Sequence, residues 1–263
     1  MNEHENTNAP NTAVVTARTV EEMDQRQLVL WVLDAMRRSI VHYGMWYTQV
    51  SQQLGLEEAN KLEAQAGDRG MAIMLKRLGK VLGFELENGL PKPLLDMGRQ
   101  QLLDLAKATS INWLVGDGVW FQAVEQDRGM TPAKLCNDGC WAHFSPFEAF
   151  RIKQLLGLGE HPGLEGLAQA LQFRLYSRIN KQSIQWEEDG ALVFYMNECR
   201  VQVARKRKGL ADYPCKSAGL IEYPFFARAI DSRIVTEVIA CPPDPHPDDW
   251  WCAWRFRIVE DES

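Results

Sequence analysis

The sequence lacks the patterns that mark a membrane protein or a nucleic-acid binder. None of its 263 residues fall in an apolar run of the ~18–20 residues that a membrane-spanning helix needs. Its first residues, MNEHENTNAPNTAVV, lack a basic segment followed by an apolar one, so no secretory leader is expected. With 29 Lys and Arg against 35 Asp and Glu, the chain has no basic excess to bind a phosphate backbone. These absences predict a cytoplasmic protein without nucleic-acid or membrane partners.

Several catalytic motifs are missing as well. The chain has no G-x-S-x-G sequence, no Walker motif and no dinucleotide-binding glycine pattern, which disfavours serine-triad hydrolysis and nucleotide chemistry. Six cysteines are too sparse in a chain of this length for a disulfide scaffold. In a reducing compartment they indicate metal binding, redox chemistry or core packing.

The sequence does contain enough apolar residues, 46%, to bury a large core. Residues 1–18 are polar and aperiodic and are expected to be a disordered tail. The pattern Thr19-x-x-Glu22 predicts a capped helix start, and apolar residues at steps of three and four from Val29 to Val50 predict a helix reaching about Leu54. After Gly55 a second helix is expected over about 56–82, giving an antiparallel helical hairpin.

The rest of the chain mixes helix and strand signals. We expect helices near 94–108, at Thr131-Pro132, at Ser145-Pro146 and over 163–178, and a strand over 111–125. Asp189-Gly190 predicts a β-hairpin, residues 199–209 a short helix ending in a basic run and glycine, and the last 30 residues a second hairpin. The predicted class is α+β, with an N-terminal helical hairpin packed on a C-terminal antiparallel-sheet ligand-binding domain. The expected division is a tail over 1–18, a helical region over 19–108 and a small-molecule-binding domain over 109–263.

Four cysteines lie in the last quarter of the chain: Cys199, Cys215, Cys241 and Cys252. Their spacings of 16, 26 and 11 match no compact zinc-finger pattern. Cys199 and Cys215 fall at expected helix starts, which lower a thiol's pKa, and the other two bracket a hairpin loop and can meet across it. Buried inert thiols, a zinc-type metal site on all four and a catalytic thiol all stay open. Cys136 and Cys140, four residues apart, are expected to have a structural role.

One polar ridge runs along the first long helix. Asp34, Arg38, His42 and Trp46 follow at steps of four, beside the apolar stripe. The spacing predicts that His42 and Trp46 face a ligand cavity, with His42 as a general base or proton carrier. The alternative is an ordinary surface ion pair of Asp34 with Arg38, and a histidine that packs on a tryptophan.

Two stretches, RRSIVHYGMWYTQV and the run from Cys199 to Phe256, resemble an uncharacterised family of bacterial and archaeal cytosolic proteins. Over roughly 185–259 the chain is also similar to the L-2-amino-thiazoline-4-carboxylic acid hydrolase-like proteins, whose ending matches Cys252-Ala253-Trp254-Arg255-Phe256, and whose cysteines match Cys199 and Cys215. A weaker similarity links the ending to the vinyl-reductase-type small-molecule-binding domain, in which C-terminal cysteines bind zinc. Cys241 and Cys252 correspond there, although the PPDPHPDDWW loop is longer here.

The resemblance implies a small-molecule-binding protein and, within that class, a hydrolase of thiazoline-like cyclic amidines. Either a C-terminal cysteine, Cys215, or a metal-bound water would then act as nucleophile, with His42 as the proton carrier. The alternative is a non-catalytic ligand sensor or carrier with a structural zinc site. The expected partners are a small-molecule ligand and a second copy of the chain in a homodimer.

Overall fold

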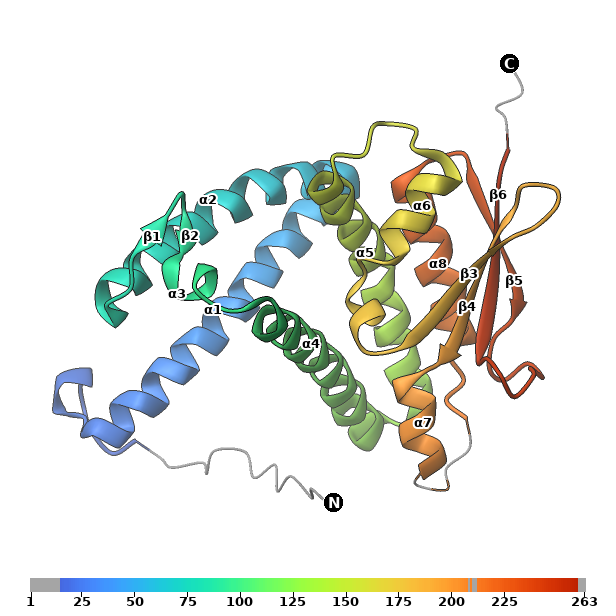
Figure 1. The fold of residues 1–263 in the computed structure, drawn as a ribbon. Coiled ribbons are helices and arrows are strands. Elements are labelled where there is room, and N and C mark those ends of the chain that lie inside the picture. Colours follow the sequence, from blue (N-terminus) through green and yellow to red (C-terminus); the bar gives the residue numbers. More distant parts are fainter. Residues whose placement is uncertain (1–14, 208, 210–211, 260–263) are drawn as a thin grey trace. The chain divides into compact units, whose positions relative to one another are not determined.

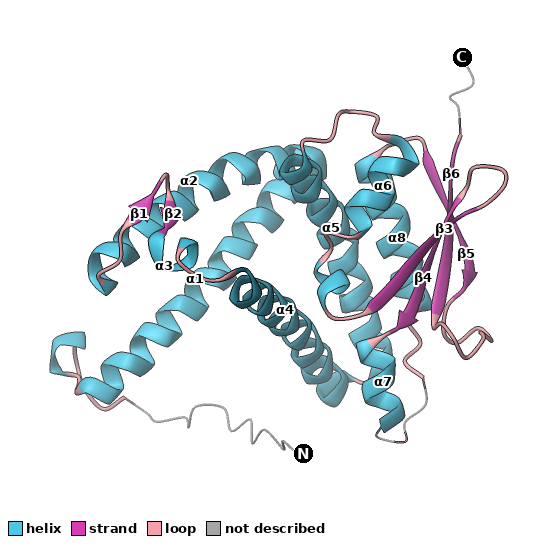
Figure 2. Cartoon of the chain, viewed as in Figure 1, coloured by secondary structure: helices cyan, strands magenta, loops and turns pink. Residues whose placement is uncertain are grey.

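The computed structural model describes residues 15–207, 209 and 212–259, coloured along the sequence in Figure 1. The chain divides into two compact units, residues 1–63 and 64–263. Helices make up the N-terminal part and a four-stranded antiparallel sheet lies near the C-terminus, which confirms the predicted α+β class (Figure 2). Within the described ranges, no helix combines the length and the apolar character that crossing a membrane requires.

The first unit contains the first helix and the turn of the predicted helical hairpin, and the second helix continues into the second unit. Helix α1 (Gln25–Leu54) ends at Gly55, whose φ of 89° suits glycine, and α2 (Leu56–Leu82) begins at once. Two tyrosines of α1 hydrogen-bond to α2: Tyr43 Oη donates to Glu63 Oε1 at 2.8 Å, and Tyr47 Oη donates to Asn60 Oδ1 at 2.6 Å. These bonds hold the two helices side by side near the turn.

The helix start predicted at Thr19 is wrong. Thr19 makes no side-chain cap and precedes only a short 3₁₀ turn, η1 (Val20–Glu22). The capping box is formed five residues later, where Asp24 Oδ1 accepts from the Gln27 amide at 2.8 Å and Gln27 Oε1 accepts from the Asp24 amide at 3.2 Å. Two polar pairs with the same spacing compete here, and the aspartate is the one that caps α1.

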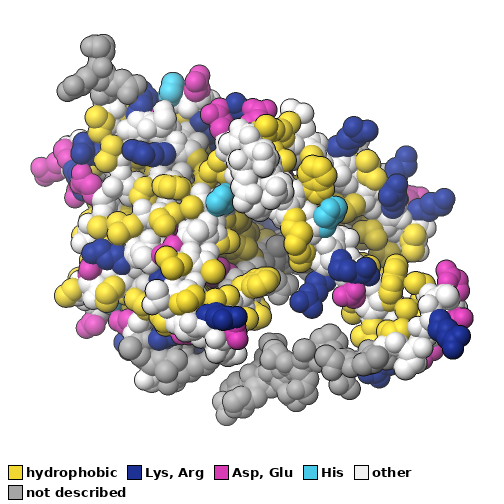
Figure 3. All heavy atoms as spheres, turned by 180° about the vertical axis from the view of Figure 1, so that it is seen from behind, with side chains coloured by type: hydrophobic (Ala, Val, Ile, Leu, Met, Phe, Trp, Pro, Cys, Tyr) yellow, Lys and Arg dark blue, Asp and Glu magenta, His cyan; other side chains and the backbone are white. Residues whose placement is uncertain are grey.

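Large hydrophobic side chains of α1 are exposed. Of the predicted apolar stripe, Ile40 is 74% exposed, and α1 has no buried residue. In Figure 3, hydrophobic side chains lie among charged ones across the face shown. The periodicity of α1 therefore predicted the helix correctly, but it did not predict a buried face.

The second unit begins within α2 and contains both the remaining helices and all the strands. Its small elements and helices are β1 (Leu86–Glu87), β2 (Leu90–Pro91), α3 (Lys92–Leu95), α4 (Arg99–Arg128), α5 (Met130–Leu156), α6 (Gly163–Leu171), η2 (Leu175–Arg178), α7 (Arg200–Arg207) and α8 (Lys216–Ile230). Helix α5 packs along α8 and also contacts α4.

Two sequence predictions fail in this region. The strand expected over 111–125 is instead part of helix α4. The aromatic side chains of Trp113, Trp120 and Phe121, which suggested a strand, line a cavity between α4 and α5. Packing against α5 therefore outweighs the β propensity of these residues. The domain boundary expected at 108/109 consequently falls inside one continuous helix. The helices expected at Thr131 and Ser145 form a single helix, α5, with Pro146 buried in its interior.

The sheet supplies the platform for the second unit. Strands β3 (Lys181–Trp186), β4 (Leu192–Glu198), β6 (Cys252–Ile258) and β5 (Ile234–Ala240) follow in that order, each antiparallel to its neighbour, so both predicted hairpins are confirmed. Phe194, Trp254 and Phe256 are almost fully buried on one face, where α6 and α8 cover the sheet (Figure 1). The opposite face carries ion pairs centred on Arg255.

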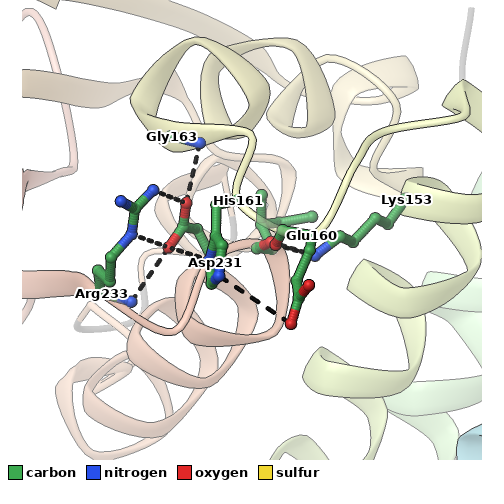
Figure 4. Close-up of polar contacts among 7 residues, drawn as sticks. Lys153, Glu160, His161, Gly163, Asp231 and Arg233 are labelled. Atoms are coloured by element: carbon green, nitrogen blue, oxygen red, sulfur yellow. Dashed lines mark hydrogen bonds and ion pairs between the residues drawn. The ribbon is translucent and has the colours of Figure 1, made fainter.

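A buried carboxylate joins the start of α6 to the end of α8 (Figure 4). Asp231 accepts hydrogen bonds from the Gly163 amide at 3.0 Å and from Arg233 Nε and Nη2 at 3.0 and 2.8 Å. The Arg233 hydrogen bonds hold the pKa of Asp231 well below its usual range. Nearby, Lys153 Nζ donates to the Ile230 and Glu160 carbonyls at 2.6 and 2.8 Å. This corner fixes α8 against α5 and α6.

The short basic helix is also confirmed. Helix α7 ends at Arg207, and Gly209 is left-handed with a φ of 65°. Its amide donates to the Lys206 carbonyl at 3.0 Å, as expected for a glycine that ends a helix. Lys208 of the predicted basic run and residues 1–14 of the predicted tail lie outside the described residues.

A candidate thiol-lined ligand site

Four cysteines from different parts of the chain line one cavity of about 360 Å³ in the second unit. Cys199 directly precedes α7, Cys215 is the N-cap residue of α8, Cys241 directly follows β5, and Cys252 is the first residue of β6. All four are free thiols. The cavity lies between α4 and α5 on one side and α7, α8 and the end of the sheet on the other.

The sheet brings two of these thiols together. Strands β5 and β6 pair Ala240 with Ala253, so the next step along the antiparallel ladder places Cys241 opposite Cys252. Both thiols are buried and belong to the hydrophobic core of the second unit. The sequence expectation that this pair meets across the hairpin agrees with this register.

The start of α8 brings the third thiol to the same place. The Lys216 amide donates to the Pro242 carbonyl at 2.9 Å, which ties the residue after Cys215 to the residue after Cys241. Gly219, one turn into α8, also allows close approach: a Cβ at this position would lie 3.6 Å from Cys241 Sγ. The first turn of α8 therefore lies directly against the end of β5.

A buried glutamine positions Cys215. Gln202 on α7 is 1% exposed, and its Nε2 donates to Cys215 Sγ at 3.2 Å and to the Tyr213 carbonyl at 2.9 Å. Its Oε1 accepts from the Tyr213 amide at 2.9 Å. When protonated, the Cys215 thiol itself donates to the Tyr213 carbonyl at 3.3 Å. One side chain thus fixes both the segment before α8 and the sulfur at its start.

The thiols differ in acidity. Hydrogen bonds from the Cys241 thiol and then from Gln202 lower the pKa of Cys215, although burial opposes them. The same thiol–thiol hydrogen bond, a second one with Cys252 and burial raise the pKa of Cys241. Burial raises the pKa of Cys199 to about 12, against backbone hydrogen bonds at the start of α7. Cys215 is therefore the most readily ionised of these three thiols, and it lies at the N-terminus of α8, where a helix stabilises an anion.

Polar aromatic and acidic side chains form another wall of the cavity: Tyr176, Glu222 and Tyr223. Glu222 lies seven residues after Cys215, two turns along the same face of α8. Burial raises the pKa of Glu222, partly offset by the Arg174 guanidinium. Its Oε1 is a buried atom to which no described residue donates a hydrogen bond of good geometry, although it forms an ion pair.

Arg174 holds this wall in place. Its side chain is 2% exposed, and Nη2 lies 2.7 Å from Glu222 Oε1 while Nε donates to Glu148 Oε2 at 2.9 Å. Its guanidinium lies 4.7 Å from the ring centroid of Phe226 and 5.6 Å from that of Tyr223. Burial disfavours the charge of Arg174, but the two carboxylates raise its pKa overall. The glutamate therefore faces the cavity from a rigid support.

A second cavity of about 530 Å³ adjoins the first, and its wall is rich in aromatic rings. Four residues line both cavities: Asp117, Phe121, Asn137 and Trp141. The second cavity is also lined by Cys136 and Cys140, for which the sequence predicted a structural role. Burial and then Asp117 raise the pKa of Cys140, which keeps its thiol protonated. The two cavities together offer a polar, thiol-lined end and an apolar end.

His42 and Trp46 are not among the residues that line these cavities. Both are on α1 in the first unit, both are exposed, and neither lines the two cavities of the second unit. No described contact tests the roles assigned to them, so the ligand-facing position of His42 and Trp46 and the proton-carrier role of His42 stay predictions.

The metal prediction also stays untested. Within residues 15–207, 209 and 212–259, no three His, Cys, Asp or Glu side chains are arranged to hold a metal ion. His246, in the loop between Cys241 and Cys252, has Nδ1 2.8 Å from the Pro247 carbonyl oxygen. Metal analysis of the purified chain tests the zinc prediction.

Sequence reasoning missed most of the cavity besides the cysteines. Gln202 follows Cys199 by three residues, the spacing of a capping box, so the sequence could have indicated that Gln202 lies near the start of α7. Glu222 and Tyr223 follow Cys215 at seven and eight residues, which is helical spacing for one face. Arg174 and Tyr176 come from a short irregular segment and carry no periodic signal.

Comparison with known proteins gives one match. Residues 93–258, more than half of the chain, match a family described as a family of unknown function (DUF6125). The matched region contains the sheet, all four cysteines of the thiol-lined cavity and both cavities. No curated protein and no solved structure matches the chain.

Proposed function

We propose that this chain, which belongs to the DUF6125 family, binds a small organic molecule in the thiol-lined cavity. One observation carries the proposal: four free thiols, three tyrosines and a buried glutamate from several elements line one cavity of about 360 Å³. Pockets for small molecules are typically ~300–1,000 Å³, mostly apolar, with a few positioned polar groups. Glu222, held by its ion pair with Arg174, gives the cavity a carboxyl group that can accept from a ligand donor.

The adjoining cavity indicates the shape of the ligand. Because the two cavities share wall residues, a ligand with a polar head and an apolar part fits them better than a compact polar molecule. Rings of Trp113, Trp120 and Phe144 line the apolar cavity and suit an aromatic or aliphatic group. The polar head would then lie among the thiols, Tyr176 and Glu222.

Within this class we propose a thiol-dependent hydrolase of thiazoline-like cyclic amidines. The lowered pKa of Cys215 supports a nucleophilic thiolate, and the similarity of the C-terminal run supports the substrate class. The Cys215 thiolate adds to the C=N carbon, and the electron pair passes to the ring nitrogen, which takes a proton. A nitrogen lone pair then re-forms a C=N bond as the ring C–S bond breaks, and the ring sulfur leaves as a thiolate that takes up a proton. Water next attacks the same carbon, and Cys215 leaves as a thiolate. Overall, one water is added and the ring is opened.

The experiment uses 2-amino-thiazoline-4-carboxylate as the probe. Its binding to the purified full chain is measured by calorimetry, and ring opening is followed by absorbance. We expect Cys215→Ser to retain binding and lose ring opening, whereas Gln185→Leu, at an exposed position on β3 outside both cavities, retains both. Binding without ring opening by the unaltered chain would make it a carrier or sensor. No binding at all would overturn the thiazoline class.

A further inference from the structure

We propose that Cys215 and Cys241 form a reversible disulfide when a hydroperoxide oxidises Cys215, which makes this pair a redox modification site. The proposal is independent of the ligand, because it needs only the thiols and an oxidant such as hydrogen peroxide. It rests on three observations: the cavity wall that the two thiols share, their different exposure, and the elements that hold them together.

The two cysteines line the same cavity from adjoining segments. Cys215 is the N-cap residue of α8, and a Cβ placed at Gly219 in the first turn of that helix would lie 3.6 Å from Cys241 Sγ. The Cys241 thiol is also near enough to perturb the pKa of Cys215. The hydrogen bond from the Lys216 amide to the Pro242 carbonyl joins the two segments one residue beyond each cysteine. A bond between the sulfurs therefore requires little movement of either segment.

The thiols differ in how an oxidant reaches them. All four thiols line the cavity, but Cys199 and Cys215 are half-buried, whereas Cys241 is 2% exposed and Cys252 is 8% exposed. Peroxide that enters the cavity therefore reaches Cys199 and Cys215 more readily than the other two, and burial raises the pKa of Cys199. Because Gln202 Nε2 donates to the Cys215 sulfur, this thiol is also the one that the structure prepares as a thiolate.

The chemistry balances with peroxide as the only co-reactant. The Cys215 thiolate attacks one peroxide oxygen, the O–O bond breaks, and Cys215 sulfenic acid and hydroxide form. The Cys241 thiol then attacks the Cys215 sulfur, the S–O bond breaks, and its proton leaves with the hydroxyl group as water. Two thiols are oxidised to one disulfide, one peroxide is reduced to two waters, and a dithiol reductant reverses the change.

Cys252 is the competing resolving thiol. It also contacts Cys241 and lies opposite it at the end of the β5–β6 ladder. A Cys241–Cys252 disulfide would have to begin at one of two almost fully buried thiols, whereas the Cys215–Cys241 disulfide begins at the half-buried thiol of Cys215. We therefore assign the disulfide to Cys215 and Cys241.

Trypsin separates the candidates cleanly. Peptide 209–216 contains Cys215 as its one cysteine, whereas peptide 234–255 contains both Cys241 and Cys252. The full chain is treated with hydrogen peroxide, alkylated, digested without reductant and mapped by mass spectrometry. We expect peptides 209–216 and 234–255 to be linked, fragmentation to place the link on Cys241, and dithiothreitol to release them. A disulfide found only within peptide 234–255, or none, would overturn the proposal.

Serine variants provide the second test. Cys241→Ser should lose the link and leave Cys215 as sulfenic acid, which a dimedone probe labels, while Cys252→Ser and the control Cys136→Ser should keep the link. Loss of the link in Cys252→Ser would show that Cys215 pairs with Cys252 instead of Cys241. Near-ultraviolet circular dichroism of each reduced variant checks its fold. The fragmentation map of the unaltered chain gives the pairing even if one variant does not fold.

Discussion

Gln202→Leu is the sharpest test of whether the site prepares Cys215 for nucleophilic chemistry. The substitution keeps a buried side chain of similar size but removes the donor that lies 3.2 Å from Cys215 Sγ. A hydrogen bond to a charged group contributes about 1.5–3 kcal/mol, and 1.36 kcal/mol corresponds to about one pKa unit. We therefore expect the pKa of Cys215 to rise and its alkylation at pH 7 to slow by up to about 10- to 100-fold, since only the thiolate reacts.

The assay follows iodoacetamide labelling of peptide 209–216 by mass spectrometry as a function of pH, so that the other five cysteines do not interfere. Gln202 also holds Tyr213, and the pH profile separates the two roles. Loss of thiolate stabilisation moves the midpoint to higher pH, whereas a displaced loop changes the limiting rate at high pH. Gln185→Leu, an exposed glutamine on β3, is the matched control. An unchanged midpoint in Gln202→Leu would refute the reasoning.

Three further predictions concern the frame around the site. Gly219→Ala places a Cβ 2.5 Å from the Trp254 ring and should destabilise the chain by about 1–3 kcal/mol in urea unfolding, whereas Gly44→Ala, with open space around it, should be neutral or stabilising. Arg174→Met leaves the buried carboxylates of Glu148 and Glu222 without their cation and should lower the free energy of unfolding by about 3–5 kcal/mol in the same assay. A decrease no larger than that for an exposed ion pair would contradict a stabilising role of these two ion pairs. Because the pKa of Asp231 is lowered in the folded chain, the stability that its carboxylate contributes is complete above about pH 4 and is lost as the pH falls. Asp231→Asn should therefore be less stable than the unaltered chain at pH 6, and it should lose less stability than the unaltered chain between pH 5 and pH 3. Urea unfolding midpoints of both proteins at pH 6, 5 and 3 test this, and equal losses between pH 5 and pH 3 would contradict it.

The sequence predicted the fold where local signals and packing agree. Gly55 and Asp189-Gly190 mark turns that the structure contains, because each glycine there has a positive φ that few other residues adopt. The strand expected over 111–125 failed for the opposite reason. Its aromatic residues have the composition of a strand, but the burial that decides between helix and strand comes from α5 and the cavity, which composition does not encode.

The candidate site was predicted in part for a similar reason. The hairpin spacing indicated that Cys241 and Cys252 meet, and the ladder register agrees, because the antiparallel partners of a hairpin can be read along the chain. Cys215 and Gln202 meet through a bridge between two helix starts, α7 and α8, which has no sequence period. The wall at Glu222 depends on Arg174, and a contact between residues so far apart is set by tertiary packing alone.

Part of the wall of the thiol-lined cavity also belongs to the hydrophobic core. A cysteine substitution in this shared wall therefore affects stability as well as chemistry. Cys241 and Cys252 pack in the same buried cluster as Trp254 and Tyr223, so replacing either alters packing and chemistry together. Cys215 only borders that cluster, and its half-buried thiol faces the cavity. Effects of Cys215→Ser on ligand or oxidant therefore report on chemistry, while the buried pair keeps the cavity wall in place. A site built this way holds its reactive sulfur against a rigid core, which is the arrangement that a positioned nucleophile requires.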